Sequence, residues 1–322
     1  MTHFNFPISV YDFMNHALYD KEHGYYMKKT PMGSKNADFI TAPELTPLFG
    51  EVLAFWILGK VFEYSENINI VEFGPGRGTM AKDILNTIKK MSPAHFNNID
   101  YHLIETSPYL IEQQKANLAE FNNVHWQEEL TELKGKTIVL ANEFFDALPV
   151  RQYQKQNNQY FERLIDKNYN FILAEQPSHI SKNYIEDIVE IYPDAQDYLK
   201  AIKEFADYAL IIDYGNLGTS ETLQAIKDHK KVDIFTDIGN CDLTTQVDFR
   251  QLIQPFDGYA EINISNMGDF LAANGLIVRA EQLLENATKE QTEHLNYVLR
   301  KLLHEDEMAK IFKVLEISEI DN

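Results

Sequence analysis

Residues Val71–Thr79 read VEFGPGRGT, and this stretch decides the fold. A short apolar run, residues 68–71, comes before it, and a helical pattern follows with apolar residues at Met80, Ile84, Leu85, Ile88 and Met91. This order predicts a strand, a tight turn and the N-terminus of a helix. Gly74, Gly76 and Gly78 would let the backbone turn sharply and approach a ligand, because they carry no β-carbon. Since the first amides of a helix lack partners within it, we predict a cofactor-binding loop.

The spacing of these glycines distinguishes two kinds of cofactor. In the dinucleotide fingerprint G-x-G-x-x-G, the third glycine comes three residues after the second. Here that position is Thr79, and the third glycine is Gly78. Glu72 lies two residues before the first glycine, where its carboxylate would repel a pyrophosphate but attract the ammonium and sulfonium groups of S-adenosylmethionine. The loop therefore favours S-adenosylmethionine over a dinucleotide, with an ordinary glycine-rich turn as the alternative.

The bulk composition is that of a globular protein, with 44% hydrophobic residues among 322. This length suits one large α/β domain with additions, or two modest domains. The formal charge of −20, from 49 acidic and 29 basic residues, would repel a nucleic-acid backbone, so we expect no DNA or RNA substrate. Such a surface could attract a basic protein substrate, although a role in solubility alone is the commoner reason for it.

The location and the metal content are predicted from what the sequence lacks. Its one cysteine, Cys241, cannot form an intramolecular disulfide or a cysteine-cluster metal site, and the histidines show no metal-ligand spacing. The first residues, MTHFNFPISVYDF, lack the patterns of a signal or transit peptide, and no apolar run approaches the length of a membrane span. We therefore expect a cytoplasmic protein without a bound metal or a membrane span, and the oligomeric state stays open.

The N-terminal part predicts two helices and a short strand. Ser9 is the expected N-cap of a helix that reaches Tyr19, with Asp12 as the acid of a capping box. A short strand is expected at residues 24–27, followed by a polar loop to residue 38. A second helix should follow Pro43 and end near residue 61, because its apolar positions have helical spacing.

From residue 68 the chain alternates apolar strands with helical patterns, which is typical of a parallel sheet covered on both faces. The predicted strands are residues 68–73, 100–105, 123–126, 137–142, 208–213, 258–263 and 311–317. The predicted helices are residues 78–91, 108–120, 198–206, 248–254, 268–274 and 279–303. The long stretch at about 151–207 suggests a β-hairpin insertion. We predict an α/β fold with a seven-stranded, mostly parallel sheet, in which residues 1–66 are an N-terminal helical extension packed on a core of residues 67–322.

Ligands of open α/β sheets bind beyond the C-terminal ends of the strands, so polar residues at those ends are candidates for the site. Glu105 closes the strand YHLI and is followed by Thr106 at the start of a helical pattern. It lies 27 residues after Gly78, near the distance expected for an acid that binds the ribose of a nucleotide through both hydroxyls. The alternative is a carboxylate that caps the helix.

A second group of polar residues follows the buried strand of residues 137–141. Asn142, Glu143 and Asp146 lie there beside two phenylalanines, as expected for the floor of an active site. A carboxylate at this place matches a guanidinium bidentately, although both acids could instead cap the following turn. Asp213 ends a further apolar strand and could face the cofactor or the substrate, or belong to a structural turn.

These residues resemble those of one family. In the chain the segments that carry the resemblance are FITAPELTPLFGE (39–51), VEFGPGRGT (71–79), ETSPYL (105–110), NEFFDALPV (142–150), DYG (213–215) and DLTTQVDF (242–249). Together they resemble the MidA family of S-adenosylmethionine-dependent methyltransferases, whose mitochondrial member is a complex I assembly factor that methylates a protein arginine. The resemblance spans nearly the whole chain. It implies a Rossmann-like class I methyltransferase sheet, an insertion over the substrate face, and symmetric dimethylation of arginine in a protein.

The resemblance and the motifs together suggest a role for each site residue. Gly74, Gly76, Gly78 and Thr79 would shape the cofactor loop, Glu72 would hold the ammonium, and Glu105 with Thr106 would bind the ribose. Asn142, Glu143 and Asp146 would line the transfer site. Within that site Glu143 would hold the guanidinium, and Glu143 or Asp213 would orient the nitrogen that sheds a proton.

Three other functions stay open from the sequence. The enzyme could methylate a small molecule, or the protein could be a non-catalytic assembly chaperone that binds the cofactor for stability. A nicotinamide-dependent oxidoreductase is disfavoured by Thr79 and Glu72.

Overall fold

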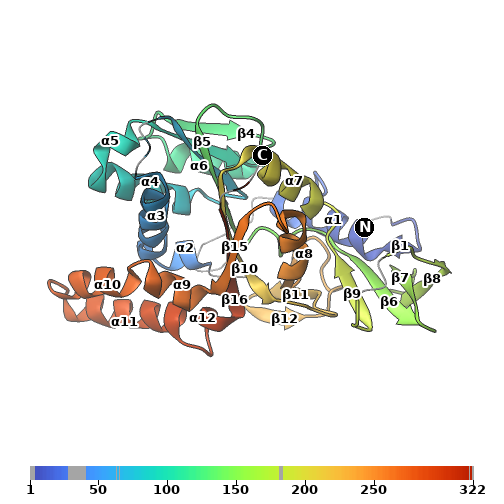
Figure 1. Cartoon of the computed structure of the whole chain (residues 1–322). Helices are drawn as coiled ribbons and strands as arrows, with labels where there is room; N and C mark the ends of the chain where they lie inside the picture. Colours follow the sequence, from blue (N-terminus) through green and yellow to red (C-terminus); the bar gives the residue numbers. More distant parts are fainter. Residues whose placement is uncertain are drawn as a thin grey trace. The chain divides into compact units, whose positions relative to one another are not determined.

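The computed structural model describes residues 4–27, 41–62, 64, 66–180, 184–318 and 320 (Figure 1). Contacts between Cα atoms divide the chain into two units. Unit 1 comprises Met1–Phe39, Phe145–Leu199 and Asn216–Leu252, and unit 2 comprises Ile40–Phe144, Lys200–Gly215 and Ile253–Asn322. The expected extension of residues 1–66 is thus divided between the units at residue 39. The polar loop expected after residue 27 lies outside the described residues.

Unit 2 is built on a mixed sheet. Its strands lie in the order β15 (Glu261–Asn266), β16 (Phe312–Ser318), β10 (Tyr208–Asn216), β5 (Lys136–Asn142), β2 (Ile68–Phe73), β3 (Ile99–Ile104) and β4 (Val124–Gln127). The five strands from β10 to β4 are parallel to their neighbours, whereas β16 pairs antiparallel with both β10 and β15. All six residues of β2 are buried, as expected for a central strand that is covered on both faces.

Helices α3 (Pro47–Val61) and α4 (Thr79–Met91) pack against each other and against β2. Their apolar side chains join those of the strands in one core, which includes Phe49, Leu53, Ile70, Ile84 and Leu140. Shorter α5 (Pro93–Phe96) follows α4, and α6 (Pro108–Asn117) connects β3 to β4. Helices α9 (Met267–Ala273), α10 (Leu276–Leu284), α11 (Lys289–Leu303) and α12 (Met308–Ile311) pack together before the last strand, as the orange and red segments of Figure 1 show.

Unit 1 contains an antiparallel sheet that the sequence predicts only in part. Its strands lie in the order β1 (Ile8–Ser9), β7 (Gln159–Ile165), β6 (Arg151–Gln156) and β9 (Ile188–Ile191), and β8 (Phe171–Pro177) also pairs with β7. A smaller sheet has the order β12 (Lys230–Val232), β11 (Gln224–Lys227) and β13 (Asp242–Thr244). The remaining elements of the unit are α1 (Val10–Tyr19), the 3-10 helix η1 (Tyr25–Met27), β14 (Val247–Asp248) and α8 (Phe249–Ile253). Helix α7 (Ala195–Phe205) begins in unit 1 and ends in unit 2, where the 3-10 helix η2 (Gln254–Phe256) also lies.

Two helices expected as continuous are each divided in two. The helix expected after Pro43 consists of α2 (Ala42–Leu45) and α3, because Thr46 between them has an extended backbone with φ −165°. The Thr46 hydroxyl accepts a hydrogen bond from the Leu48 amide at 3.2 Å, and Pro47 begins α3. The helix expected at residues 279–303 consists of α10 and α11, since Thr288 starts a new helix with a capping box. In both places a threonine is the N-cap of the second helix.

Three further expectations need correction. Residues 24–27 do not form a strand but include η1. The insertion is not a single hairpin, because β8 and β9 extend it and β1 joins its sheet. Strand β10 does not end at Asp213 but continues to Asn216. By contrast, Ser9 is confirmed as the N-cap of α1, where its hydroxyl accepts from the Asp12 amide at 3.0 Å and donates to the Asp12 carboxylate at 2.5 Å.

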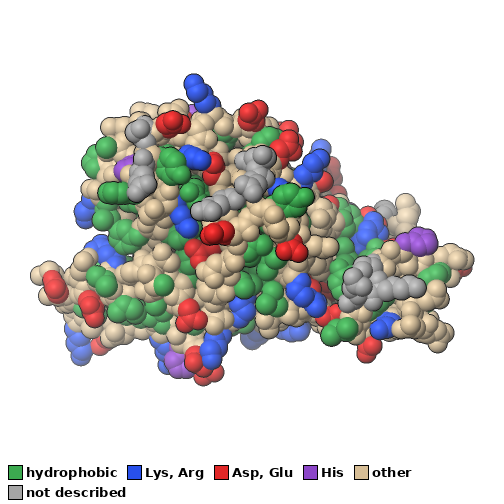
Figure 2. Space-filling model, in the orientation of Figure 1, with side chains coloured by type: hydrophobic (Ala, Val, Ile, Leu, Met, Phe, Trp, Pro, Cys, Tyr) green, Lys and Arg blue, Asp and Glu red, His purple; other side chains and the backbone are tan. Residues whose placement is uncertain are grey.

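Acidic and basic side chains are interspersed on the face of the molecule drawn in Figure 2. This arrangement fits the role in solubility that the sequence suggests for the charge of −20.

The contact between α3 and α4 leads to a test of the core. A β-carbon added at Gly50 would lie 2.6 Å from Asp83 Cβ on α4, which is too close for the helices to keep their distance. We expect Gly50→Ala to lower the free energy of unfolding by about 1–3 kcal/mol, measured by urea denaturation. The matched control is Gly59→Ala on the same helix, which would meet no atom within 4 Å and should stabilise the helix by up to about 1 kcal/mol. Equal effects of the two variants would contradict this packing.

Candidate functional site

The ends of four parallel strands in unit 2 bring most of the predicted site residues to one edge of the sheet. Asn142 at the end of β5 is in register with Ile212 of β10. The next residue, Glu143, donates its amide hydrogen to the Ile212 carbonyl oxygen at 2.8 Å, which places it beside Asp213. On the other side of β5, Ala141 is in register with Phe73, directly before the glycine loop.

The same edge continues through β3 to β4. The Gly74 amide donates to the carbonyl oxygen of Ile104 at 3.1 Å, and the Glu105 amide donates to that of Gln127 at 3.2 Å. Asp213, Glu143, Gly74 and Glu105 therefore follow one another across neighbouring strands. This is the edge at which ligands of open α/β sheets bind.

The glycine loop has the backbone shape that the sequence predicts. Gly74, Gly76 and Gly78 all have positive φ, at 60°, 53° and 77°. A β-carbon at Gly74 would lie 2.8 Å from the ring of Phe144, so the loop can approach that ring only without a side chain. At Gly76 a β-carbon would meet no atom within 4 Å, so the loop faces open space there. A ligand could therefore approach the backbone of the loop at Gly76.

A charged contact that the sequence does not reveal connects the glycine loop to α2. The guanidinium of Arg77 forms an ion pair with Glu44 of α2, with Nε donating to Oε1 at 3.2 Å. The Thr79 hydroxyl donates to the same carboxylate at 2.7 Å. The Thr79 side chain, expected to contact the cofactor, therefore contacts Glu44. The segment FITAPELTPLFGE of the family resemblance includes this acid, and that is the signal that could have found it.

Glu105 lies at the start of α6, where both of its proposed roles can be compared. Its Oε1 accepts from the amides of Thr106 at 2.9 Å and Ser107 at 2.8 Å, which is the capping alternative. Its Oε2 accepts from the side-chain amide of Gln114 at 3.1 Å. Burial raises the pKa of Glu105, while these hydrogen bonds act in the opposite direction. Each carboxylate oxygen has two lone pairs, and these hydrogen bonds occupy three of the four, so acceptor capacity is left on Oε2 for one hydroxyl of a ribose.

Glu72 is a buried carboxylate inside β2, with 2% of its surface exposed. The Tyr101 hydroxyl of the neighbouring strand donates to its Oε2 at 2.6 Å. Burial raises the pKa of Glu72 to about 7, partly offset by this hydrogen bond. A carboxylate with such a pKa is only about half ionised at neutral pH, and a cation bound nearby would favour its ionised form.

The residues expected at the transfer site lie in unusual surroundings. Glu143 has φ 51° although it is not a glycine, a conformation that costs about 1–3 kcal/mol and is concentrated at functional sites. The Asn142 side-chain amide donates to its Oε1 at 3.4 Å. Asp213 is completely buried, and its carboxylate accepts from the Tyr214 amide at 2.9 Å. Two acidic residues thus lie side by side where β5 pairs with β10.

Asp146, the fourth residue expected there, belongs to unit 1. Its carboxylate accepts from the Thr244 hydroxyl at 2.8 Å, and its carbonyl oxygen accepts from the Thr245 amide at 3.0 Å. Burial raises the pKa of Asp146 to about 6, while the hydrogen bond from Thr244 lowers it. These contacts bind the NEFFDALPV segment to the DLTTQVDF segment within unit 1.

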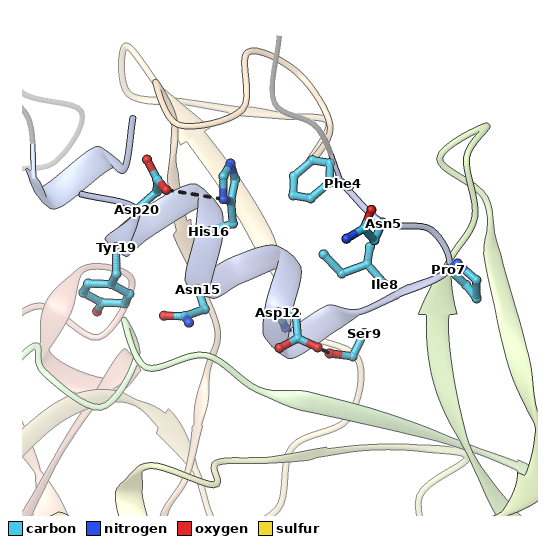
Figure 3. Close-up of a pocket in the computed structure, with 10 residues that line it drawn as sticks. All are labelled: Phe4, Asn5, Pro7, Ile8, Ser9, Asp12, Asn15, His16, Tyr19 and Asp20. Atoms are coloured by element: carbon cyan, nitrogen blue, oxygen red, sulfur yellow. Dashed lines mark hydrogen bonds and ion pairs between the residues drawn. The ribbon is translucent and has the colours of Figure 1, made fainter. Parts of the chain in front are cut away.

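A pocket of about 510 Å³ lies beside α1 in unit 1 (Figure 3). Several of its polar side chains have structural partners, since Ser9 and Asp12 form the N-cap of α1 and His16 pairs with Asp20 at 3.7 Å near the helix end. Figure 3 shows Ser9 beside Asp12 at the start of the helix and His16 beside Asp20 near its other end. We therefore assign the pocket no part of the candidate site.

Among the described residues, no three His, Cys, Asp or Glu side chains are grouped so that they could hold a metal ion, and no helix is long and apolar enough to cross a bilayer.

Comparisons with known proteins agree on one chemistry. A family model described as "Putative S-adenosyl-L-methionine-dependent methyltransferase" matches residues 52–264. The mitochondrial protein arginine methyltransferase NDUFAF7 of Xenopus laevis is 29% identical, over 97% of this chain and 81% of its own length. The protein of the same name from Homo sapiens is 31% identical, over 88% of this chain and 73% of its own length.

The solved structures include a Burkholderia thailandensis protein described as a "likely methyl transferase" and bound to S-adenosyl-homocysteine. Its TM-score is 0.82 at 25% identity, over 98% of this chain and 89% of that one. The expected cytoplasmic location is contradicted by the curated relatives, which are named as mitochondrial proteins.

The raised pKa of Glu72 leads to a pH test of its expected contact with an ammonium group. If the ionised carboxylate holds the ammonium, affinity for S-adenosyl-homocysteine should increase as the pH is raised through about 7 and decrease as the pH is lowered through that value. Between pH 8 and pH 6 we expect a loss of about tenfold, since the ionised fraction falls by that factor. Isothermal titration calorimetry should show that Glu72→Gln lacks the part of the pH dependence that comes from Glu72. Titration of the ligand itself affects the wild-type protein and the variant equally, so the difference between their pH profiles reports on Glu72. The same pH profile in both would exclude the contact.

Proposed function

Because the chain belongs to the family of S-adenosyl-L-methionine-dependent methyltransferases, we propose that it methylates arginine side chains of a protein. The family membership confirms the resemblance that the sequence motifs indicate. Relatives named protein arginine methyltransferases align with most of the chain. The observation that carries the proposal is the strained backbone of Glu143, whose amide hydrogen bond to Ile212 places it beside Asp213 and whose neighbour Phe144 lies against Gly74.

The candidate cofactor residues fit S-adenosylmethionine. The loop faces open space at Gly76. Glu72 lies inside β2, one residue before its end, and would meet a cation, and Glu105 directly follows the adjacent strand β3 and would meet the ribose. When bound, the cofactor supplies a methyl group on a sulfonium, so transfer breaks a sulfur–carbon bond, leaves its electron pair on sulfur and forms a nitrogen–carbon bond. We propose that the sheet and its helices form a Rossmann-like class I methyltransferase core around this site.

The residues of the transfer site would position the acceptor and handle one proton. The planar carboxylate of Glu143 matches a guanidinium through two parallel hydrogen bonds. Such a grip aligns the nitrogen for an in-line displacement, in which positioning contributes most of the acceleration. Arginine is protonated in proteins, so one proton must leave the reacting nitrogen as the new bond forms. Glu143 or Asp213 would accept or orient that proton, with the Asn142 amide holding Glu143 in place.

The finer features of the reaction follow from the same resemblance. We propose symmetric dimethylation of the acceptor arginine and a protein acceptor in respiratory complex I assembly. The family resemblance of the motif set supports both features, and the relatives named protein arginine methyltransferase NDUFAF7 support a protein arginine as the acceptor.

Two other functions predict experimental outcomes that differ from those of the proposed function. A small-molecule methyltransferase would bind the cofactor but label no protein, and a non-catalytic assembly chaperone would bind it without any transfer. The test incubates the protein and labelled S-adenosylmethionine with a lysate of cells that lack it, followed by mass spectrometry of labelled peptides. Dimethylarginine in a protein supports the proposal, whereas label only in small molecules, or no label at all, favours one of the alternatives.

The variant Glu143→Gln separates transfer from cofactor binding. It keeps the shape of the side chain but removes the charge that pairs with a guanidinium, so methyl transfer should fall by roughly 100-fold or more. Affinity for S-adenosyl-homocysteine should stay within about twofold, because Glu143 lies on the acceptor side. Glu290→Gln at the exposed start of α11 is the matched control and should change neither. Equal loss of binding and transfer in Glu143→Gln would refute this role.

A further inference from the structure

Gln114 of α6 is a polar residue at the centre of the cofactor side of the site, and the sequence motifs do not single it out. This residue is completely buried. Its Nε2 donates to the Gly76 carbonyl oxygen at 2.7 Å and to Glu105 Oε2 at 3.1 Å. Its Oε1 accepts from the indole nitrogen of Trp126 at 3.0 Å. One side chain thus connects the glycine loop, the expected ribose acid and the end of β4.

The chemistry of the partners fixes which way the Gln114 amide points. An indole N–H can only donate, so the amide oxygen must face Trp126. The amide nitrogen must then face the carbonyl oxygen of Gly76 and the carboxylate of Glu105, which only accept when the acid is ionised. All three bonds require the same orientation. A buried amide whose bonds are all satisfied in one orientation fixes the positions of its partners.

We propose that Gln114 is a positioning residue that holds the glycine loop and Glu105 in the geometry that binds the cofactor, with Trp126 setting its orientation. The inference rests on the proposed function for its cofactor, but it concerns only binding. Without Gln114, the Gly76 carbonyl and one oxygen of Glu105 would lose a donor, and the loop could move relative to the acid. Glutamate at this position would place a second carboxylate beside Glu105, and asparagine would be one methylene too short.

The two tryptophans of the chain, Trp56 and Trp126, make this arrangement measurable. In a Trp56→Phe background the only indole is Trp126, which bonds to Gln114. Ligand binding that tightens the Glu105–Gln114 contact should therefore change the emission of Trp126. A residue that served stability alone would not transmit cofactor binding to this indole.

The experiment compares Gln114→Leu with Gln113→Leu, both in the Trp56→Phe background. Gln113 is the half-exposed neighbour on the same helix, so the substitution is identical and only the contacts differ. Gln114→Leu should weaken binding of S-adenosyl-homocysteine about 10- to 100-fold. This range is expected for the loss of the neutral hydrogen bond to the Gly76 carbonyl oxygen and the charged hydrogen bond to Glu105. It should also abolish the change in Trp126 emission on binding. Gln113→Leu should leave both unchanged.

A second substitution covers the case in which Gln114→Leu does not fold, which circular dichroism would show. Trp126→Phe keeps an aromatic ring but removes the donor that orients the amide, and it should weaken binding several-fold. In steady-state assays with the Trp56→Phe protein and Gln114→Leu, KM for S-adenosylmethionine should rise while kcat changes by less than about twofold.

The outcomes distinguish this inference from the proposed function. Wild-type affinity in both Gln114→Leu and Trp126→Phe would overturn the positioning role and leave the methyltransferase proposal intact. Weakened binding in those variants, with no arginine methylated by the wild-type protein, would support the positioning role and refute the proposed acceptor. A wild-type protein that does not bind S-adenosyl-homocysteine at all would overturn both.

Discussion

The parallel pairing of β5 with β2 on one side and β10 on the other is the constraint on which the site depends. Because the three strands run in the same direction, their C-terminal ends meet at one edge, and the residues after them become neighbours. Residues separated by about 140 positions, from the glycine loop to Asp213, are brought together in this way. The backbone bonds of the pairing set their spacing before any of their side chains makes a contact. The site is therefore largely a product of strand register.

Burial is the second determinant of the site, and it acts on the carboxylates. Glu72 and Glu105 are withdrawn from water, and the pKa of each is raised in consequence. Asp83 on α4 shares this property, because burial and the nearby charge of Glu51 raise its pKa to about 6. Acids of this kind are costly to ionise in the absence of a cation. A cofactor with positive groups would supply the charge that these surroundings lack.

The comparison of sequence and structure shows which features are local and which are not. Strand β2 was predicted with both its bounds, since a continuous apolar run before a glycine turn specifies a central strand by itself. The break at Thr46 was missed although Pro47 follows it, because apolar spacing continued through the break. The role of Gln114 could not be predicted, because glutamine is common on exposed helix faces and its burial depends on β4 and the loop. Asp146 was grouped with Glu143 because they are close in sequence, but its partners come from a segment about 100 residues later.

The position of β16 has a consequence for how the protein is made. This strand follows β10 and β15 in the sequence, yet it lies between them in the sheet and pairs with both. A chain that emerges from the ribosome in order can assemble the parallel strands early, but it cannot place β15 until residues up to Ser318 have appeared. Until then one side of β10 presents unpaired backbone groups, which are prone to aggregation. The nascent chain thus has an interval in which a chaperone that covers this edge would be of use.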